Sequence, residues 1–206
     1  MNQLKEKSMR LVFLIAACVS VLCVVLICMF LFVNGVPAIA EIGPLKYLLG
    51  SQWKPNQNLY GIAPMIVGSL YVTAGAMIVG VPLGILTAVG LARFCGKRSH
   101  KWLSPAISLM AGIPSIVYGF WGVVVLVPLM RAIGLGGKSI LTASILLGMM
   151  ILPTIIHVAE AAIRSVPATY YESALALGAS HERSVFFVQL PAAKSGIMAA
   201  VVLGMG

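Results

Sequence analysis

Long apolar runs, separated by short polar segments, indicate a chain that crosses a membrane several times. The first run covers 23 uncharged residues, Leu11 to Val33. Further apolar runs cover about 64–92, 105–130 and 140–163, and a fifth starts near Ser195 and is still apolar at Gly206. A hydrocarbon core of ~30 Å needs about 20 helical residues. The first four runs are therefore predicted to span a bilayer, and the fifth to begin another crossing.

The runs and the segments between them divide the chain into three parts. We expect a cytoplasmic tail and first membrane helix at 1–33, a periplasmic loop at 34–63, and a membrane domain over 64–206 that includes a long polar loop at 164–194. Because the fifth run is too short to span a bilayer before Gly206, we expect the sequence to be a C-terminally truncated form of a longer protein.

Small residues and prolines inside the runs predict details of the membrane helices. Gly80/Gly84 and Ser115/Gly119 are small residues four positions apart, a spacing that lets neighbouring helices approach closely. Ser104-Pro105 is a plausible N-cap and first helical residue of the third run. Internal prolines are tolerated in membrane helices because neighbouring groups satisfy the freed backbone positions.

The composition supports a protein with little surface in water. The chain is 60% hydrophobic and 9% charged, whereas soluble domains carry roughly 25% charged residues. Its net charge of +9 comes from short basic clusters between apolar runs. This placement indicates membrane topology and excludes a nucleic-acid-binding face.

The basic residues also predict the orientation. With the N-terminus inside, ten lysines and arginines fall in cytoplasmic segments and four in outer ones, as the positive-inside rule requires. The inner ten are Lys5, Lys7, Arg10, Arg93, Lys97, Arg98, Lys101, Arg164, Arg183 and Lys194. The loop 164–194 is then cytoplasmic.

No motif in the sequence predicts a catalytic or metal site. The stretch ending in Lys138-Ser139 nearly matches a phosphate-binding P-loop, but Ala132 stands where a glycine is required, and the stretch joins two membrane helices. There is no HExxH or GxSxG motif. Cys18, Cys23, Cys28 and Cys95 lack metal spacing and are interpreted as apolar packing residues.

Three ionisable residues share one face near the inner end of the fourth run. His157, Glu160 and Arg164 lie at positions i, i+3 and i+7. A Glu160–Arg164 pair at i, i+4 is a sufficient structural explanation. A transport gate is the alternative, because charges near a membrane usually face the interior of a bundle or a partner.

The cytoplasmic loop predicts two short helices joined at a glycine. Pro167 can open the first helix, and Gly178 can end it in the left-handed conformation. Ser180 is a candidate N-cap for the second, which Pro191 would end. The first helix has an apolar face of Tyr171, Ala174 and Leu175. Such a hairpin could lie on lipid or dock onto a cytoplasmic partner.

This loop resembles the EAA loop of ATP-binding-cassette (ABC) importer permeases, whose consensus is E-A-A-x3-G-x9-I-x-L-P. Glu172, Ala174, Gly178, Leu190 and Pro191 match at the family spacing, while Ser173 replaces an alanine and Val188 the isoleucine. The resemblance implies a type I importer membrane bundle, with about five helices here and six in the complete protein. It also implies that Glu172, Ser173, Ala174, Gly178, Leu190 and Pro191 couple the permease to an ATPase subunit.

A second set of segments is similar to phosphate-specific permeases, in particular their C-type subunit. These segments are Ala111–Gly119, Val127-Pro128, Trp53-x-Pro55, Pro82–Gly84, Leu152–Thr154 and Val166-Pro167. The resemblance implies phosphate transport, with Ser115 and Tyr118 as candidate pathway residues. Molybdate and sulfate permeases share the coupling loop and are the alternative. The basic-and-acidic motif of this family falls beyond residue 206.

The resemblance also implies the partners. These are a second permease subunit, a cytoplasmic ATPase dimer that binds ATP and Mg²⁺, a periplasmic phosphate-binding protein and the lipid of a bacterial inner membrane. The chain itself would then hold no cofactor and catalyse no reaction. A secondary transporter is the rival from another class, but it predicts charges at the bilayer midplane, and the first three runs carry none.

Overall fold

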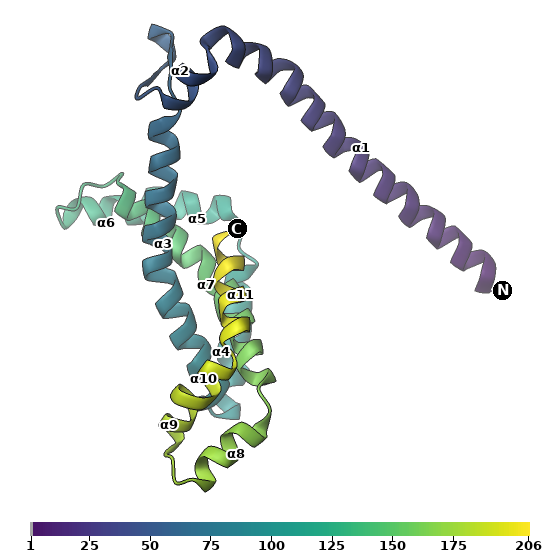
Figure 1. Cartoon of the computed structure of the whole chain (residues 1–206), viewed down its shortest axis with the longest axis vertical. Helices are drawn as coiled ribbons and strands as arrows, with labels where there is room; N and C mark the ends of the chain where they lie inside the picture. Colours follow the sequence, from purple (N-terminus) through teal and green to yellow (C-terminus); the bar gives the residue numbers. More distant parts are fainter. Residues whose placement is uncertain (1) are drawn as a thin grey trace. The chain divides into compact units, whose positions relative to one another are not determined.

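The computed structural model describes residues 2–206, with side chains from residue 6 onward, and these residues are almost entirely helical (Figure 1). The chain divides into two compact units, residues 1–67 and residues 68–206.

The first unit contains one long helix and a small hairpin. Its elements are α1 (Asn2–Ile42), α2 (Pro44–Leu49), β1 (Trp53–Lys54), the 3-10 turn η1 (Pro55–Gln57), β2 (Leu59–Tyr60) and the first residues of α3 (Ala63–Val89). The two strands pair antiparallel, and the Trp53 and Tyr60 rings meet edge to face with centroids 5.8 Å apart.

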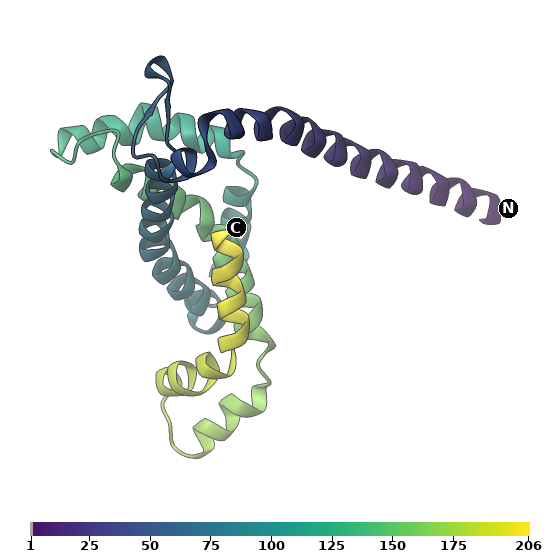
Figure 2. The ribbon, with the colours of Figure 1, turned by 45° about the horizontal axis from the view of Figure 1, so that its top comes forward.

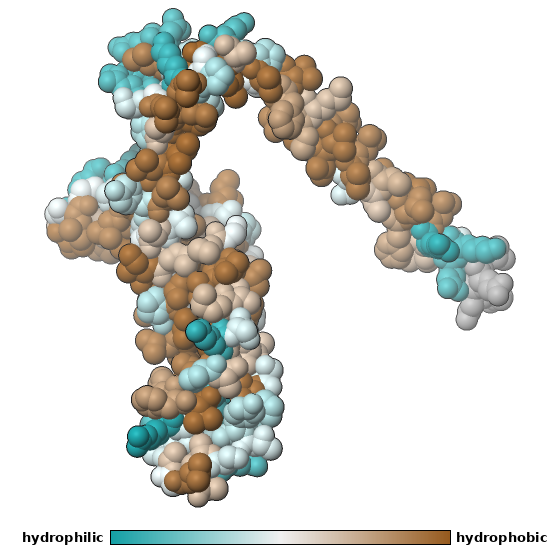
Figure 3. All heavy atoms as spheres, viewed as in Figure 1, coloured by the Kyte–Doolittle hydropathy of each residue, from teal (hydrophilic) through white to brown (hydrophobic). Residues whose placement is uncertain are grey.

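Helix α1 continues to Ile42, so the prediction that it ends at Val33 is wrong. Pro37 lies inside it and removes only one backbone donor, and the helix-favouring Ala38–Ala40 that follow can continue the helix. No described residue of α1 is buried, and hydrophobic side chains cover most of its visible length (Figure 3). Cys18, Cys23 and Cys28 are exposed on it, and their interpretation as apolar packing residues stays a prediction.

The second unit contains the remaining helices. After α3 and its terminal π-turn η2 (Gly90–Phe94) come α4 (Lys97–Ala111), α5 (Ser115–Trp121), η3 (Gly122–Leu126), α6 (Val127–Ala132), α7 (Ile140–Ser165), α8 (Ala168–Ala176), α9 (His181–Ser184), η4 (Val185–Gln189), α10 (Leu190–Ala192) and α11 (Lys194–Met205). The positions of α3, α7 and α11 agree with the second, fourth and fifth apolar runs.

The sequence pattern predicted that the third apolar run forms one helix, but the structure divides this run between two helices. Helix α4 begins at Lys97, ahead of the predicted Ser104-Pro105 start, and ends at Ala111 before α5 begins at Ser115. Pro114 disfavours helical backbone at the preceding residue, and Gly112 adds no helix propensity. The break therefore follows from two residues that hydropathy alone does not register.

Two π-turns each end two residues before a proline. The π-turn η3 precedes Pro128, and η4 precedes Pro191. A proline ring clashes with the carbonyl four residues earlier, and here that carbonyl lies within the wider π-turn. The helix after Ser180 therefore runs through Pro191 to Ala192, and the prediction that Pro191 ends it is wrong.

Close contacts at glycines hold α3, α7 and α11 together. A Cβ on Gly80 would lie 2.8 Å from Ile151 Cδ1, and one on Gly84 would lie 2.7 Å from Ile155 Cγ2. The predicted packing role of Gly80 and Gly84 is confirmed. A Cβ on Gly119, by contrast, would meet no atom within 4 Å in the described chain outside its own stretch of helix, so no close helix contact is formed there. Helix α11 runs beside α7 in both ribbon views (Figures 1 and 2).

Helices long and apolar enough to span a membrane account for most of the described residues. Four qualify by length and composition: Glu6–Ile42, Ala63–Phe94, Ser115–Ala132 and Ile140–Ser165. The pair His181–Ala192 and Lys194–Met205, bent by 70°, would be a fifth span within the described part of the chain. The predicted all-α membrane fold is confirmed.

Candidate functional site

The segment between α7 and α11, residues 167–193, forms two short helices that meet at a turn (Figures 1 and 2). We call this segment the hairpin. Val166 and Pro167 are extended, and Pro167 stands at the N-cap position of α8 with φ −53° and ψ 138°. Its fixed φ stops α7 and starts α8 in a new direction.

Gly178 ends α8 as predicted. Its φ of +85° lies in the left-handed region, which glycine adopts at no steric cost. The amide of Gly178 donates to the Leu175 carbonyl at 2.9 Å, and the amide of Ala179 donates to the Ala174 carbonyl at 3.0 Å. These two bonds form a Schellman motif, which fixes the exit direction of the helix.

Ser180 caps the second helix, again as predicted. Its Oγ accepts a hydrogen bond from the Arg183 amide at 3.3 Å. Glu182 lies in the first turn, fully exposed, where a hydrogen bond from its own backbone amide and one from Ser180 lower the pKa of its carboxyl. Both ends of the turn are therefore held by local hydrogen bonds.

Inside the hairpin, α8 and α9 are tied by one polar contact. The Tyr171 hydroxyl and His181 Nδ1 lie 2.8 Å apart, and the two rings meet edge to face at 5.7 Å. A shallow hollow of about 340 Å³ separates α8 from η4. It is lined by Thr169, Tyr170, Ser173, Ala174, Leu177 and Val188.

The residues predicted for coupling occupy different environments. On α8, Glu172 and Ser173 are exposed and Ala174 is buried, and Gly178 follows at the turn. At the other end of the hairpin, Leu190 is half-buried against the core and Pro191 is exposed. The predicted apolar face of α8 is not a single exposed surface, because Ala174 is buried and Tyr171 half-buried. The most exposed apolar side chains here are Leu177, 88% exposed, and Phe187, 75% exposed.

At the base of the hairpin, two arginines cross between helices. Arg93 Nη2 in η2 donates to the Ile163 carbonyl at 2.7 Å, and Arg164 Nη2 in α7 donates to the Leu91 carbonyl at 2.9 Å. Carbonyls in the last turn of a helix lack intrahelical donors. The exchanged bonds therefore bind the end of α3 to the end of α7.

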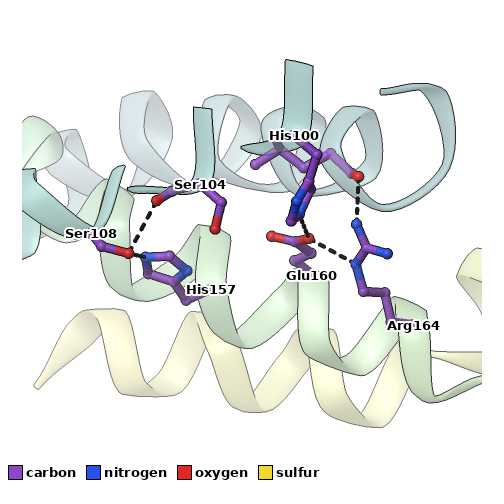
Figure 4. Close-up of polar contacts among 7 residues, drawn as sticks. His100, Ser104, Ser108, His157, Glu160 and Arg164 are labelled. Carbon is purple, nitrogen blue, oxygen red and sulfur yellow. Dashed lines mark hydrogen bonds and ion pairs between the residues drawn. The ribbon is translucent and has the colours of Figure 1, made fainter. Parts of the chain in front are cut away.

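Glu160 is the acceptor at the centre of a polar cluster between α4 and α7 (Figure 4). Its Oε1 lies 2.8 Å from Arg164 Nε and 2.7 Å from His100 Nε2, and Glu160 is only 7% exposed. The predicted Glu160–Arg164 pair is confirmed. One turn earlier on α7, His157 Nε2 lies 3.3 Å from Ser108 Oγ, so the shared face is directed at α4.

Phe94, the last residue of η2, contacts the hairpin. Its ring lies edge to face against His181 at 4.9 Å, and 6.2 Å from the Phe186 ring. Since His181 is also bonded to Tyr171, aromatic contacts connect η2 to both hairpin helices.

The two candidate pathway residues lie elsewhere. Ser115 is the exposed first residue of α5. The Tyr118 hydroxyl donates to the Met110 carbonyl across the α4–α5 break at 3.1 Å, and its ring borders an apolar pocket with Ile113, Val117, Trp121 and Met149. Their role in transport stays a prediction.

Comparison with known proteins identifies the family. Residues 80–206 match the family model of the binding-protein-dependent transport system inner membrane component. The chain belongs to this family. Its fold is therefore that of the type I ABC importer membrane bundle. The matched residues begin within α3 and continue through α11.

Several individual permeases are similar over most of the chain. The Probable ABC transporter permease protein YqgH of Bacillus subtilis is 36% identical over 99% of this chain and 68% of its own length. The phosphate transport system permease protein PstC of Mesorhizobium japonicum is 30% identical over 85% of the chain and 60% of its own length. The Probable PstC of Methanocaldococcus jannaschii is 32% identical over 88% and 65%. No solved structure gives a significant match.

Sequence reasoning missed several members of this permease-family site. Arg93 was counted only as one of the cytoplasmic basic residues, and His100 and Phe94 were not singled out. Their partners lie 60 to 70 residues away in the chain for His100 and Arg93, so no local spacing connects them. Nothing in the sequence singles out Glu160 as the partner of His100, because Glu172 and Glu182 lie on the same predicted side.

Proposed function

We propose that this chain is the transmembrane subunit of an ATP-driven ABC importer that carries inorganic phosphate across the bacterial inner membrane. The observation that carries the proposal is the hairpin, a capped and internally bonded element that presents the EAA-loop positions between two apolar helices. On this proposal the N-terminus and the hairpin are cytoplasmic.

The geometry of the hairpin suits contact with a partner. Glu172 and Ser173 are exposed on α8, and Leu177 and Phe187 place large apolar side chains in solvent. Exposed apolar side chains grouped with polar ones mark interaction surfaces. The partner we propose is a cytoplasmic ATPase dimer, which binds ATP and Mg²⁺ and carries out the hydrolysis that this chain does not.

Because the hairpin is joined to two membrane helices, a force on the hairpin can move these helices. It joins α7 at Val166 and α11 at Ala193, both buried in the same core. A rigid element fixed at both ends rotates the helices to which it is attached when a partner domain closes on it. We propose that ATP-driven closure moves α7 and α11 in this way and alternates access across the membrane.

Phosphate is the proposed substrate because two of the three relatives compared above are named as phosphate permeases. The name of the third specifies no substrate. The partners that we propose for a phosphate importer are a second permease subunit and a periplasmic phosphate-binding protein. Molybdate and sulfate are the competing oxyanions.

Substitution of Glu172 tests the coupling role. Because Glu172 is exposed on α8, Glu172→Lys reverses the charge of the docking surface without disturbing the fold. We expect the full-length variant to co-purify with much less ATPase and to lose phosphate uptake. Glu41→Lys, an exposed carboxylate in the other unit, is the control and should retain both. Full ATPase retention and uptake by Glu172→Lys would contradict coupling through this surface.

The substrate is tested in the reconstituted complex. ATP hydrolysis in proteoliposomes should rise when binding protein loaded with phosphate is added, and should not rise with molybdate or sulfate. Stimulation by either of these anions without stimulation by phosphate would overturn the substrate assignment and leave the coupling role intact.

A further inference from the structure

The hairpin has a third attachment besides its two covalent ends. Its helices continue into α7 and α11, but α3 is not adjacent to it in sequence. Besides the apolar core that α3 shares with Val185 and Leu190, Phe94, at the end of the π-turn that closes α3, reaches the hairpin with ring contacts to His181 at 4.9 Å and to Phe186 at 6.2 Å.

We infer that Phe94 is the positioning residue through which movement of the hairpin reaches α3. The inference rests on the proposed coupling function and adds the route within the permease. Without the ring contacts, a push on the hairpin would reach α7 and α11 through the backbone. It would reach α3 through the apolar core that Val185 and Leu190 share with α3 and through the bonds between α3 and α7, which are less direct.

The hairpin side of this contact is well fixed. His181 is the first residue of α9, directly after the Ser180 cap, and its Nδ1 lies 2.8 Å from the Tyr171 hydroxyl. The ring that meets Phe94 is therefore held by both hairpin helices. Phe186 follows in η4, one residue after the fully buried Val185, so its backbone is anchored to the core.

The α3 side is fixed as well. Arg93, the neighbour of Phe94, donates to the Ile163 carbonyl, and Arg164 donates back to the Leu91 carbonyl in the same π-turn. The π-turn cannot yield to a push without breaking these bonds. Further along α3, Gly84 packs against Ile155 of α7, so a push delivered at Phe94 acts on a helix that is held at its end and along its length.

Two exposed side chains of the hairpin do not belong to this route. Phe187, adjacent to Phe186, is 75% exposed, and Leu177 at the turn is 88% exposed. Both are available to a partner outside the chain. Phe94 and Phe186 are 46% and 42% exposed, but Phe94 also meets the rings of His181 and Phe186.

The test measures phosphate transported per ATP hydrolysed by the full-length complex in proteoliposomes. For Phe94→Ala we expect normal co-purification of the ATPase but a ratio lowered about 2- to 30-fold, the range for residues that modulate coupling between sites. Phe94→Tyr keeps the ring and should restore the ratio. Phe13→Ala, an exposed phenylalanine on α1, is the matched control and should leave it unchanged.

A double variant distinguishes one shared contact from two separate effects. If Phe94 acts through His181, then Phe94→Ala/His181→Ala should lower the ratio no further than the stronger single variant. An unchanged ratio in Phe94→Ala, or fully additive losses, would overturn the inference. Loss of ATPase binding by Glu172→Lys but not by Phe94→Ala separates this route from the docking role. Failure of the wild-type permease to bind an ATPase would refute the proposed function itself.

Discussion

Arg93 and Arg164 exchange hydrogen bonds across the ends of two helices. Each guanidinium donates to a backbone carbonyl of the other helix, at 2.7 Å from Arg93 to Ile163 and 2.9 Å from Arg164 to Leu91. Arg164 also donates from Nε to Glu160. One planar guanidinium can serve both acceptors because its donors point in fixed, divergent directions. The two residues hold the end of α3 against the base of the hairpin.

Removal of either arginine should lower the thermal stability of the purified permease complex. We expect a loss of about 1–2 kcal/mol for Arg93→Ala or Arg164→Ala, since a hydrogen bond from a charged group contributes on this scale and Arg164 is partly solvated. Arg164→Lys should recover only part of the loss. Arg98→Ala, an exposed arginine in α4, is the control. Equal melting temperatures for Arg164→Lys and the wild type would contradict the exchanged bonds.

Replacement of Glu160 should lower the free energy of unfolding more than replacement of either arginine. Glu160→Leu leaves His100 and Arg164 without their acceptor in a site where the carboxylate is 7% exposed. Because the side chains of His100 and Arg164 are 32% and 47% exposed, water partly replaces the lost acceptor, and we expect a loss of about 2–3 kcal/mol. The additional change His100→Leu should recover part of it, because the same interaction is removed. If chemical or thermal unfolding gave Glu160→Leu the same free energy of unfolding as Glu41→Leu, the cluster would contribute nothing to stability.

Ile155 should be sensitive to added volume on two sides. A Cβ on Gly84 would lie 2.7 Å from Ile155 Cγ2, and one on Gly204 would lie 2.8 Å from Ile155 Cγ1. We expect Gly84→Ala and Gly204→Ala each to destabilise the helix packing by about 1–3 kcal/mol through overpacking. Ile155→Ala alone should cost about 2–5 kcal/mol, because Ile155 is fully buried and its loss leaves a cavity. In either glycine variant, Ile155→Ala removes the clashing Cγ atoms, so the two losses should sum to less than their separate values. Gly68→Ala, whose added Cβ would have no neighbour within 4 Å in the described chain, is the control. Fully additive losses would count against the packing.

The turn at Gly178 should tolerate few residues. Its φ of +85° costs a residue with a Cβ about 1–2 kcal/mol, and asparagine less than alanine. We therefore expect Gly178→Ala to reduce ATPase co-purification and Gly178→Asn to reduce it less. Gly96→Ala is a suitable control, because Gly96 has a negative φ and no neighbour within 4 Å in the described residues. Equal effects of the two Gly178 substitutions would mean that the left-handed turn does not determine docking.

The local features of the site were predictable from sequence because their chemistry acts within a few residues. The Gly178 turn, the Ser180 cap and the Glu160–Arg164 pair all involve partners at most five positions apart. The packing of Gly80 and Gly84 was predictable for a related reason, since small residues at this spacing permit close helix contact whatever the partner helix is.

The remaining features depend on which helices become neighbours, and hydropathy does not contain that information. His100 meets Glu160 only because α4 breaks away at Gly112–Pro114 and lies along α7. Phe94 meets His181 only because the hairpin folds back towards η2. The continuation of helix through Pro191 was missed because a π-turn accommodates the ring. The contacts of Glu172 with an ATPase lie outside a single chain and stay a prediction.

The side of the membrane on which the hairpin lies tests the central claim most directly. A single cysteine at Ala176, exposed at the end of α8, would be introduced after replacement of Cys18, Cys23, Cys28 and Cys95. A membrane-impermeant thiol reagent should label it in inside-out vesicles stripped of ATPase, and should not label it in intact cells or after the ATPase is restored. Labelling in intact cells from the periplasmic side would contradict the importer account.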